Sequence, residues 1–551
     1  MDFPTARADS TTGTHEHTRL LPSSVEESRQ GISTTKEMSS CRDTTTSAPP
    51  WQLGASDTDE KSERSLLDRA CRTDDECGAF EPDSPPLFAG KFTAYLWISA
   101  VAIALNALSL GYDVGCMNDA LGLITAQYQL DYYQGEIIDG CLNFFAAIGA
   151  LFAARLADGP LGRRGCLACS AGSYLAGICV STLAVNWVMV AAGRALCGIA
   201  VGLSFSSGGL YLTEISPAHL RGTLGSLYDL GIDMGIVLGS LVGYMAMVTD
   251  TALFGSRWRF MVGFGAAMPA LVLIAAPFLP ESPRWLLANG RPREARETLQ
   301  RLYGDTGSSV KNAMREFQQC CSGEPASWKD FFNEMVTNAG GMRRTLLLVM
   351  TLGILQQATG SESILYYCHI FLRESGTKST AALSLGFVFV GLSKLAGNIP
   401  PLLFADAYGR LPFLRFSSVG VAGALFSLVI VCNAGTYGIA EVVLMCVFLF
   451  FFSFGLGTLL WVIIPEMLPF QWRARGLAGV VVLNRFTSAT VTMTALSIIK
   501  LVHVSGFFTL YLGFAIVCLM LTFMILPETA GKSLESLTRT TSHEALSWGL
   551  I

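Results

Sequence analysis

Asp158-Gly-Pro-Leu-Gly162-Arg163-Arg164 follows one long apolar run of the chain, and Asp406-Ala-Tyr-Gly409-Arg410 follows another. The second stretch repeats the first, with Gly409 standing 247 positions after Gly162. Two further pairs of charged signals recur at similar offsets: Glu214…Arg221-Gly222 with Glu466…Arg473-Ala-Arg475-Gly476, and Pro280-Glu281-Ser282 with Pro527-Glu528-Thr529. Short charged motifs that recur in the same order between apolar runs predict a duplicated bundle of membrane helices. A solute site in such proteins lies between the two halves, near the middle of the bilayer.

The composition also indicates a membrane protein. Charged residues make up 15% of the chain and apolar residues 51%, whereas soluble domains carry roughly 25% charged residues. A helix needs about 20 apolar residues to cross a hydrocarbon core roughly 30 Å thick. We therefore expect an all-α membrane protein with twelve transmembrane helices in two pseudo-symmetric six-helix halves. The twelve apolar stretches are 92–116, 136–156, 165–184, 187–210, 224–246, 258–279, 344–372, 381–404, 411–432, 439–463, 474–500 and 505–526.

The charge is unevenly distributed along the chain. Residues 1–90 hold 17 acidic and 9 basic side chains, and the remainder holds 26 acidic and 29 basic ones. Because 1–90 is rich in Ser, Thr, Asp and Glu and lacks the apolar core of a signal peptide, we expect a disordered acidic cytosolic tail. Four further domains follow it: a six-helix half (91–280), a cytosolic segment with an amphipathic helix around Arg293–Glu297 (281–343), a second six-helix half (344–527) and a C-terminal tail (528–551).

The basic residues of the short loops predict the orientation. Loops rich in Lys and Arg face the cytosol, so we expect both termini to be cytosolic. Loops that contain basic residues alternate with loops that contain fewer Lys and Arg. The basic residues are Arg163, Arg164, Arg221, Arg410, Arg473 and Arg475.

The sequence offers no constellation for an enzyme, a metal site or a nucleotide site. The six histidines are scattered and no Gly-rich loop opens a helix after a strand, so we expect no cofactor, no metal and no nucleic-acid partner. Most of the fifteen cysteines lie in apolar helices, where cysteine behaves as a small hydrophobe. Gly235, Gly239 and Gly243 recur at every fourth position of the fifth span, which indicates close helix packing.

Seven of the ionisable residues inside the predicted spans are candidates for a functional site. A charge at the bilayer centre costs roughly 2.5–3.5 kcal/mol on insertion scales, so such residues face the bundle interior, pair with one another or bind a ligand. A structural ion-pair network is the alternative to a functional site. The residues are Asp113, Arg194, Asp229, Asp233, Glu362, Lys394 and Arg485, among which Asp233 is the weakest candidate.

Neutral hydrogen-bonding groups accompany these charges. Amides, carboxylates and cations beside one aromatic plane suit a polyhydroxylated solute, because each hydroxyl donates and accepts. Trp461 lies between Gly455-Leu-Gly457 and Pro465, where we expect the tenth span to be broken or kinked; a tryptophan of the interfacial belt is the alternative interpretation. The other neutral groups are Gln356, Gln357, Tyr366 and Asn484.

The motifs together resemble the sugar porter family of the major facilitator superfamily, across essentially all of 92–535. The resemblance implies the major facilitator fold and alternating access to a central sugar site. The matching pieces are Gly111-Tyr112-Asp113, Gly162-Arg163-Arg164, Tyr211-Leu-Thr-Glu214…Arg221-Gly222, Pro280-Glu-Ser-Pro-Arg-Trp-Leu286, Gln356-Gln357…Gly360…Tyr366-Tyr367, Gly409-Arg410 and Pro527-Glu528-Thr529.

Within the family, the chain looks most like the polyol and monosaccharide proton symporters of plants. The resemblance implies that Asp113 takes the proton and that Arg194 is its partner. With the residues singled out above, it leads us to expect a substrate site formed by Asp229, Gln356, Gln357, Glu362, Tyr366, Lys394, Trp461, Asn484 and Arg485. Our hypothesis is that Glu362 and Lys394 serve this one site. Asn398 has the wrong spacing for the asparagine that hexose carriers have on this helix. A cytosolic gate of ion pairs would be formed by Arg163, Arg164, Glu214, Arg221, Glu281, Arg410, Glu466, Arg473, Arg475 and Glu528.

The expected function is therefore secondary active transport of a polyol, cyclitol or monosaccharide with proton symport, in a lipid bilayer and by a monomer. A facilitative hexose uniporter and a non-transporting nutrient sensor on the same fold are the alternatives. We expect the plasma membrane as the location. The acidic dileucine motif Glu16-His-Thr-Arg-Leu20-Leu21 makes a vacuolar or endolysosomal membrane the alternative.

Overall fold

The computed structural model describes residues 93–217, 221–249, 256–304, 310–311, 313–315, 317, 328–337, 342–374, 379–434, 439–468 and 470–528. The predicted N-terminal tail with its dileucine motif lies outside the described residues. So do almost all of the C-terminal tail, part of the segment 281–343 and the side chain of Arg221.

The first half contains six crossings, as predicted. The N-termini of two of them are capped by side chains: Asn186 accepts the N–H of Met189 at 2.9 Å, and Asp131 and Gln134 form a capping box. The helices are α2 (Ala94–Tyr128), α3 (Tyr132–Asp158), α4 (Gly162–Thr182), α5 (Trp187–Ile215), α6 (Arg221–Val248), and a sixth crossing in three pieces, α7 (Arg257–Phe264), α8 (Ala267–Ala275) and η3 (Ala276–Phe278).

The second half has more interrupted helices. Gly360, with φ of 86°, separates α13 from α14, and a π-helical stretch separates α17 from α18 at the predicted break before Pro465. His503 has non-helical backbone angles within α19, so two crossings share that label. The elements are α13 (Arg343–Ala358), α14 (Ser361–Glu374), α15 (Thr380–Tyr408), α16 (Arg410–Ala434), α17 (Ile439–Phe451), η4 (Phe452–Gly457), α18 (Leu459–Met467) and α19 (Phe470–Met524).

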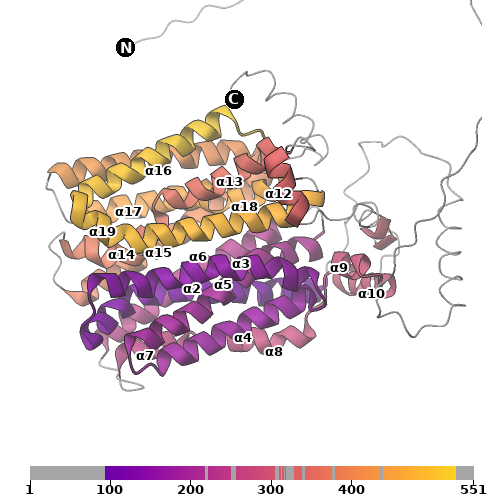
Figure 1. Cartoon of the computed structure of the whole chain (residues 1–551), viewed down its shortest axis with the longest axis horizontal. Helices are drawn as coiled ribbons and strands as arrows, with labels where there is room; N and C mark the ends of the chain where they lie inside the picture. Colours follow the sequence, from indigo (N-terminus) through magenta and orange to yellow (C-terminus); the bar gives the residue numbers. More distant parts are fainter. Residues whose placement is uncertain are drawn as a thin grey trace, which may run out of the picture. The chain divides into compact units, whose positions relative to one another are not determined.

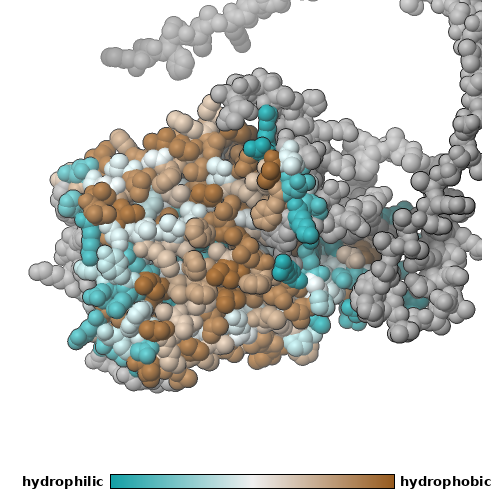
Figure 2. Space-filling model, in the orientation of Figure 1, coloured by the Kyte–Doolittle hydropathy of each residue, from teal (hydrophilic) through white to brown (hydrophobic). Residues whose placement is uncertain are grey.

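Twelve crossings account for these helices. Ten of the described helices are long and apolar enough to span a membrane, and one of them, Arg475–Met524, is 50 residues long and contains two crossings. The remaining crossing is the pair α13 and α14, each shorter than a span because Gly360 divides them. The space-filling view shows the matching surface, apolar across the middle and hydrophilic toward both ends (Figure 2).

The described residues of the segment between the halves include the short helices α9 (Pro283–Ala288), α10 (Pro292–Tyr303) and α12 (Trp328–Thr337). α10 buries Ala295, Leu299 and Leu302 on one side and exposes the Arg291–Glu294 pair on the other. The predicted amphipathic helix is therefore confirmed. α9 and α10 lie beyond one end of the bundle (Figure 1).

The two halves form separate blocks that meet along α3 with α19 and α6 with α15 (Figure 1). We call the end with Gly162-Arg163-Arg164 and Gly409-Arg410 the motif end, and the opposite end the far end. Near the far end the halves are joined by hydrogen bonds. Asn118 donates to the carbonyl of Leu365, and Ser497 donates its N–H and hydroxyl to Glu136 at 2.9 to 3.2 Å.

Close helix packing within the first half depends on glycine, as the spacing of the fifth span predicted. A Cβ on Gly235 would lie 2.7 Å from the backbone nitrogen of Tyr112, and one on Gly239 would lie 2.7 Å from that of Cys116. Gly111 of α2 makes an equally close approach to the backbone of α6. α2 and α6 therefore pack backbone against backbone, which fixes the depth of Asp113 beside the centre of the bundle.

We expect Gly239→Val to destabilise the protein by about 1–3 kcal/mol, because the added methyl groups would force α2 and α6 apart. Thermal unfolding of the purified protein in detergent measures the effect. Gly423→Val is the matched control, since a Cβ on Gly423 of α16 meets nothing within 4 Å. Equal unfolding midpoints for the two variants would show that the α2–α6 contact tolerates side chains.

Candidate functional site

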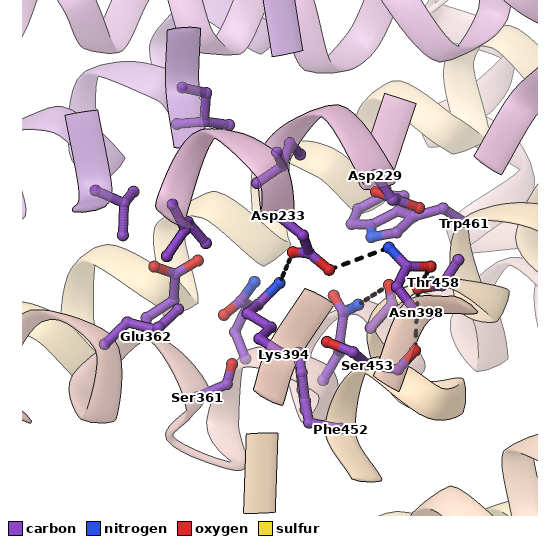
Figure 3. A pocket seen from close by; sticks show the side chains of 18 of the residues that line it. Asp229, Asp233, Ser361, Glu362, Lys394, Asn398, Phe452, Ser453, Thr458 and Trp461 are labelled. Atoms are coloured by element: carbon purple, nitrogen blue, oxygen red, sulfur yellow. Dashed lines mark hydrogen bonds and ion pairs between the residues drawn. The ribbon is translucent and has the colours of Figure 1, made fainter. Parts of the chain in front are cut away.

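A cavity between the two halves contains most of the predicted substrate residues. The residues that line it come from helices of both halves (Figure 3). Eight of the nine predicted substrate residues are among them: Asp229, Gln356, Gln357, Glu362, Tyr366, Lys394, Trp461 and Arg485. The ninth, Asn484, is fully buried behind the wall.

One ion pair crosses the cavity between the halves. Lys394 of α15 bonds to Asp233 of α6, and Asn398 donates to the other oxygen of Asp233 at 3.1 Å (Figure 3). Thr458 in turn donates to Asn398 at 3.0 Å. Asp233, which ranked last from sequence, is therefore the partner of Lys394. Asn398 lines the cavity although its spacing did not match the family pattern.

A second pair of charges lies elsewhere in the same cavity. Arg485 Nη1 stands 3.7 Å from Glu362 and 3.4 Å from the amide oxygen of Asn143. Asn143 is a lining residue that sequence reasoning missed, because a single asparagine in an apolar helix carries no motif. Glu362 and Lys394 line the same cavity, but each has a different charged partner. That the two serve one site stays a prediction.

Amide side chains stabilise the cavity wall at the places where the helices are broken. Gln356 donates to the carbonyls of Leu456 and Gly457 at 2.8 and 3.1 Å, and these are carbonyls of the π-helical stretch and its end. Asn484 donates to Gln356 at 2.7 Å and accepts from Arg485 at 2.7 Å. Asn484 thus positions two lining residues instead of facing the cavity itself.

Trp461 lies one turn after the π-helical stretch and packs edge-on against Phe205 of α5, with ring centroids 4.7 Å apart. The guanidinium of Arg485 lies 4.9 Å from the centroid of the same Phe205 ring. Phe205 therefore connects the indole to the second charge pair. Trp461 lines the central cavity, which argues against the interfacial belt as the reason for this tryptophan.

The predicted coupling pair is formed within the first half. Arg194 Nη1 lies 2.7 Å from Asp113, and its Nε donates to the carbonyl of Ile138 at 2.8 Å. Both side chains are almost completely buried. Leu110 and Val114, on either side of Asp113 along α2, line the cavity, so the pair lies directly beside it.

The motif end of the first half is built around two carboxylates. Glu281 accepts the backbone N–H groups of Arg163 and Arg164 at 2.8 and 3.3 Å, at the start of α4, where an anion is favoured. The Arg163 side chain binds Glu214 through two hydrogen bonds of 3.0 and 3.1 Å. Burial raises the pKa of Glu281, although the N–H groups that it accepts oppose this shift.

The second half repeats this construction. Glu528 accepts the N–H groups of Arg410 and Leu411 at 3.0 and 2.9 Å, and the Arg410 side chain pairs with Glu466. The glycines before the two arginines share the left-handed conformation, with φ of 69° at Gly162 and 89° at Gly409. These pairs each join residues of one half, so they shape the end of that half. Their predicted role in closing the cytosolic gate stays a prediction.

Residues 99–540 match the family model described as sugar (and other) transporter. The chain is 30% identical over 448 residues to probable polyol transporter 4 of Arabidopsis thaliana, covering 80% of this chain and 84% of that protein. It is 30% identical over 443 residues to the galactose-proton symporter of Escherichia coli (strain K12), covering 79% and 92%. The solved structure of the proton:xylose symporter XylE bound to 6-bromo-6-deoxy-D-glucose has a TM-score of 0.70 at 22% identity, covering 82% of this chain and 99% of that chain. This last similarity shows a shared fold.

The pairing in the cavity predicts which variants depend on each other. Asp233→Asn or Lys394→Gln alone leaves a buried charge without its partner, so each should weaken solute binding strongly. The double variant should cost little more than either single variant, with a coupling energy of about 1–3 kcal/mol. Glu362→Gln combined with Lys394→Gln should be closer to additive, because their partners differ. Calorimetric titration of the purified variants measures these energies, and additive losses for Asp233 and Lys394 would contradict the pairing.

Proposed function

Because the chain belongs to the family of sugar (and other) transporters, we propose that it carries a polyol, cyclitol or monosaccharide across a membrane together with protons. The chain is an integral, multi-pass membrane protein. The observation that carries the proposal is the buried Asp113–Arg194 pair beside a cavity lined with charges from both halves.

The cavity chemistry favours a neutral solute with several hydroxyl groups. Lys394 with Asp233 and Arg485 with Glu362 are pairs of opposite charge, so a charged solute would have to compete with a built-in counter-ion. A hydroxyl group can instead donate to a carboxylate and accept from a cation, and charge-assisted hydrogen bonds are stronger than neutral ones. The similarity to proteins named polyol transporters agrees with this substrate class.

The coupling mechanism follows from the Asp113–Arg194 pair. A proton bound to Asp113 removes the negative charge that holds Arg194 Nη1 at 2.7 Å, and the guanidinium is then free to take another partner. Such a change drives transport only if the two states of the bundle bind the proton differently. The named function of the Escherichia coli relative, galactose-proton symport, supports coupling of this kind.

The same proposal includes the orientation and the location. The motif end would face the cytosol, because its loops carry Arg163, Arg164 and Arg410. Both termini would then be cytosolic and the plasma membrane the site of action. A single chain would suffice for transport, since the cavity is lined by both halves of one chain.

We expect Asp113→Asn to abolish accumulation of solute against its gradient while leaving exchange of solute across the membrane. The amide keeps a hydrogen-bonding group beside Arg194 but cannot take up a proton. Uptake into proteoliposomes with and without an imposed proton gradient measures both activities. Glu294→Gln is a suitable control, because Glu294 is an exposed carboxyl of α10 outside the bundle.

Undiminished accumulation by Asp113→Asn would remove Asp113 from the coupling mechanism. Equal uptake by the unaltered protein with and without the gradient would instead identify a facilitative uniporter.

We expect polyols, inositols and monosaccharides to compete with one another, and deoxy analogues to bind at least about tenfold more weakly, because a missing hydroxyl leaves buried polar groups unpaired. Trp461→Ala should weaken all of these solutes to a similar degree, since the indole contributes contact area. Trp97→Ala is the matched control, because Trp97 of α2 is 43% exposed on the outer surface. Competition assays in proteoliposomes test the series, and transport of amino acids or organic cations alone would refute the substrate class.

A further inference from the structure

Asp139 of α3 is a buried carboxyl that the mechanism described so far does not use. Its side chain is 1% exposed, and neither of its oxygens accepts a hydrogen bond from the described residues. An ionised carboxylate in such surroundings is costly unless it is paired and hydrogen-bonded. Asp139 therefore needs either a proton or a close cation.

Among the described residues, Arg194 is the only cation close to Asp139. Nη2 of Arg194 stands 3.9 Å from Asp139, at the edge of an ion pair, and makes no hydrogen bond in the described part of the chain. The other two nitrogens are occupied, Nη1 by Asp113 at 2.7 Å and Nε by the carbonyl of Ile138 at 2.8 Å. Among the described residues, a guanidinium nitrogen without a hydrogen bond thus faces a carboxyl without one.

The charges of this cluster do not balance if both acids are ionised. Asp113 and Asp139 would carry two negative charges against the single positive charge of Arg194. Two carboxyls that share one site cannot both ionise readily, and their protons belong to the pair. Asp113 holds Arg194 at the shorter distance, which favours Asp139 as the neutral member of the pair.

The position of Asp139 along α3 places it between the far end and the coupling pair. Glu136, one turn earlier, makes the far-end contact with Ser497. The guanidinium of Arg194 is bonded to Ile138, the residue next to Asp139. Other titratable side chains near the cluster, within the described residues, are Tyr112 and Cys116 of α2, Cys141 of α3, Tyr174 of α4, Cys197 of α5, and Tyr366 and Tyr367 of α14.

We propose that Asp139 is a second proton-binding carboxyl of the coupling site, which shares both a proton and Arg194 with Asp113. The structure shows Asp113 holding Arg194, and the proposal assigns the proton of this arrangement to Asp139. When the proton leaves an oxygen of Asp139 and binds an oxygen of Asp113, the Nη1–Asp113 pair breaks and an Nη2–Asp139 pair forms. One proton moves, one ion pair replaces another, and the net charge of the cluster is unchanged. The inference rests on the proposed proton symport.

The consequence is that Asp139 makes Asp113 easier to protonate, because Arg194 then always has a carboxylate partner. In Asp139→Asn, a proton on Asp113 leaves Arg194 with no carboxylate, so protonation needs a higher proton concentration. We expect the pH of half-maximal proton-driven uptake to fall by about one unit or more, a tenfold change in proton concentration. Maximal uptake at acidic pH and solute exchange without a gradient should stay close to those of the unaltered protein.

The experiment measures uptake into proteoliposomes over a range of pH for the unaltered protein, Asp139→Asn and Glu294→Gln. Glu294→Gln is the control, because Glu294 is an exposed carboxyl of α10 outside the bundle. It should leave the pH midpoint unchanged. Thermal unfolding should show little change for Asp139→Asn, since asparagine mimics the neutral carboxyl, and Asp139→Glu should bring the pH midpoint back toward that of the unaltered protein.

Three results would overturn the inference: a pH midpoint in Asp139→Asn equal to that of the unaltered protein, an equal shift in Glu294→Gln, or a marked loss of thermal stability in Asp139→Asn. If the unaltered protein shows no gradient-driven accumulation at any pH, the proposed symport itself fails and the inference fails with it. Accumulation by the unaltered protein with an unchanged midpoint in Asp139→Asn overturns only the role of Asp139.

Discussion

A charge inside an apolar bundle must be matched by an opposite charge or by a proton, and the arrangement of this protein depends on that constraint. Lys394 is held by Asp233 across the two halves, Arg485 stands beside Glu362, and Arg194 is held by Asp113. An unpaired buried charge costs several kcal/mol. The helices around each of these charges can therefore pack closely only while the charge is paired. A solute or a proton that changes one pairing therefore changes the relative stability of the arrangements of the halves.

The same constraint acts on the backbone around the cavity. Gly360 divides the seventh crossing and the π-helical stretch divides the tenth, and both breaks free carbonyl and N–H groups that lipid cannot satisfy. The breaks face the interior, where Gln356 donates to the carbonyls of Leu456 and Gly457. Irregular backbone at this depth is stable only where protein or water meets its polar groups, so the broken helices and the polar cavity occur together.

Duplication explains why the ends of the two halves have the same construction. Glu281 and Glu528 each accept two successive backbone N–H groups where a helix begins after a left-handed glycine. The side chains of Arg163 and Arg410 each form an ion pair with a glutamate of their own half. The repeat therefore preserves a local structure within each half. Contacts between the halves that would close this end have to come from other residues. At the far end such contacts are present, from Asn118 and Glu136.

The sequence by itself determined the twelve crossings, their division into two halves and the break near Trp461, whereas the partnership of Asp113 and Arg194 was implied by the family resemblance. These features follow from local patterns: apolar length, glycine and proline positions, and motifs at fixed spacing. Only the tertiary structure decided that Lys394 pairs with Asp233, that Asn143 and Asn398 line the cavity and that Asp139 faces Arg194. Which polar side chains meet depends on the rotation and depth of helices far apart in the chain. Close glycine contacts such as Gly239 against α2 set that geometry, and apolar periodicity alone does not specify it.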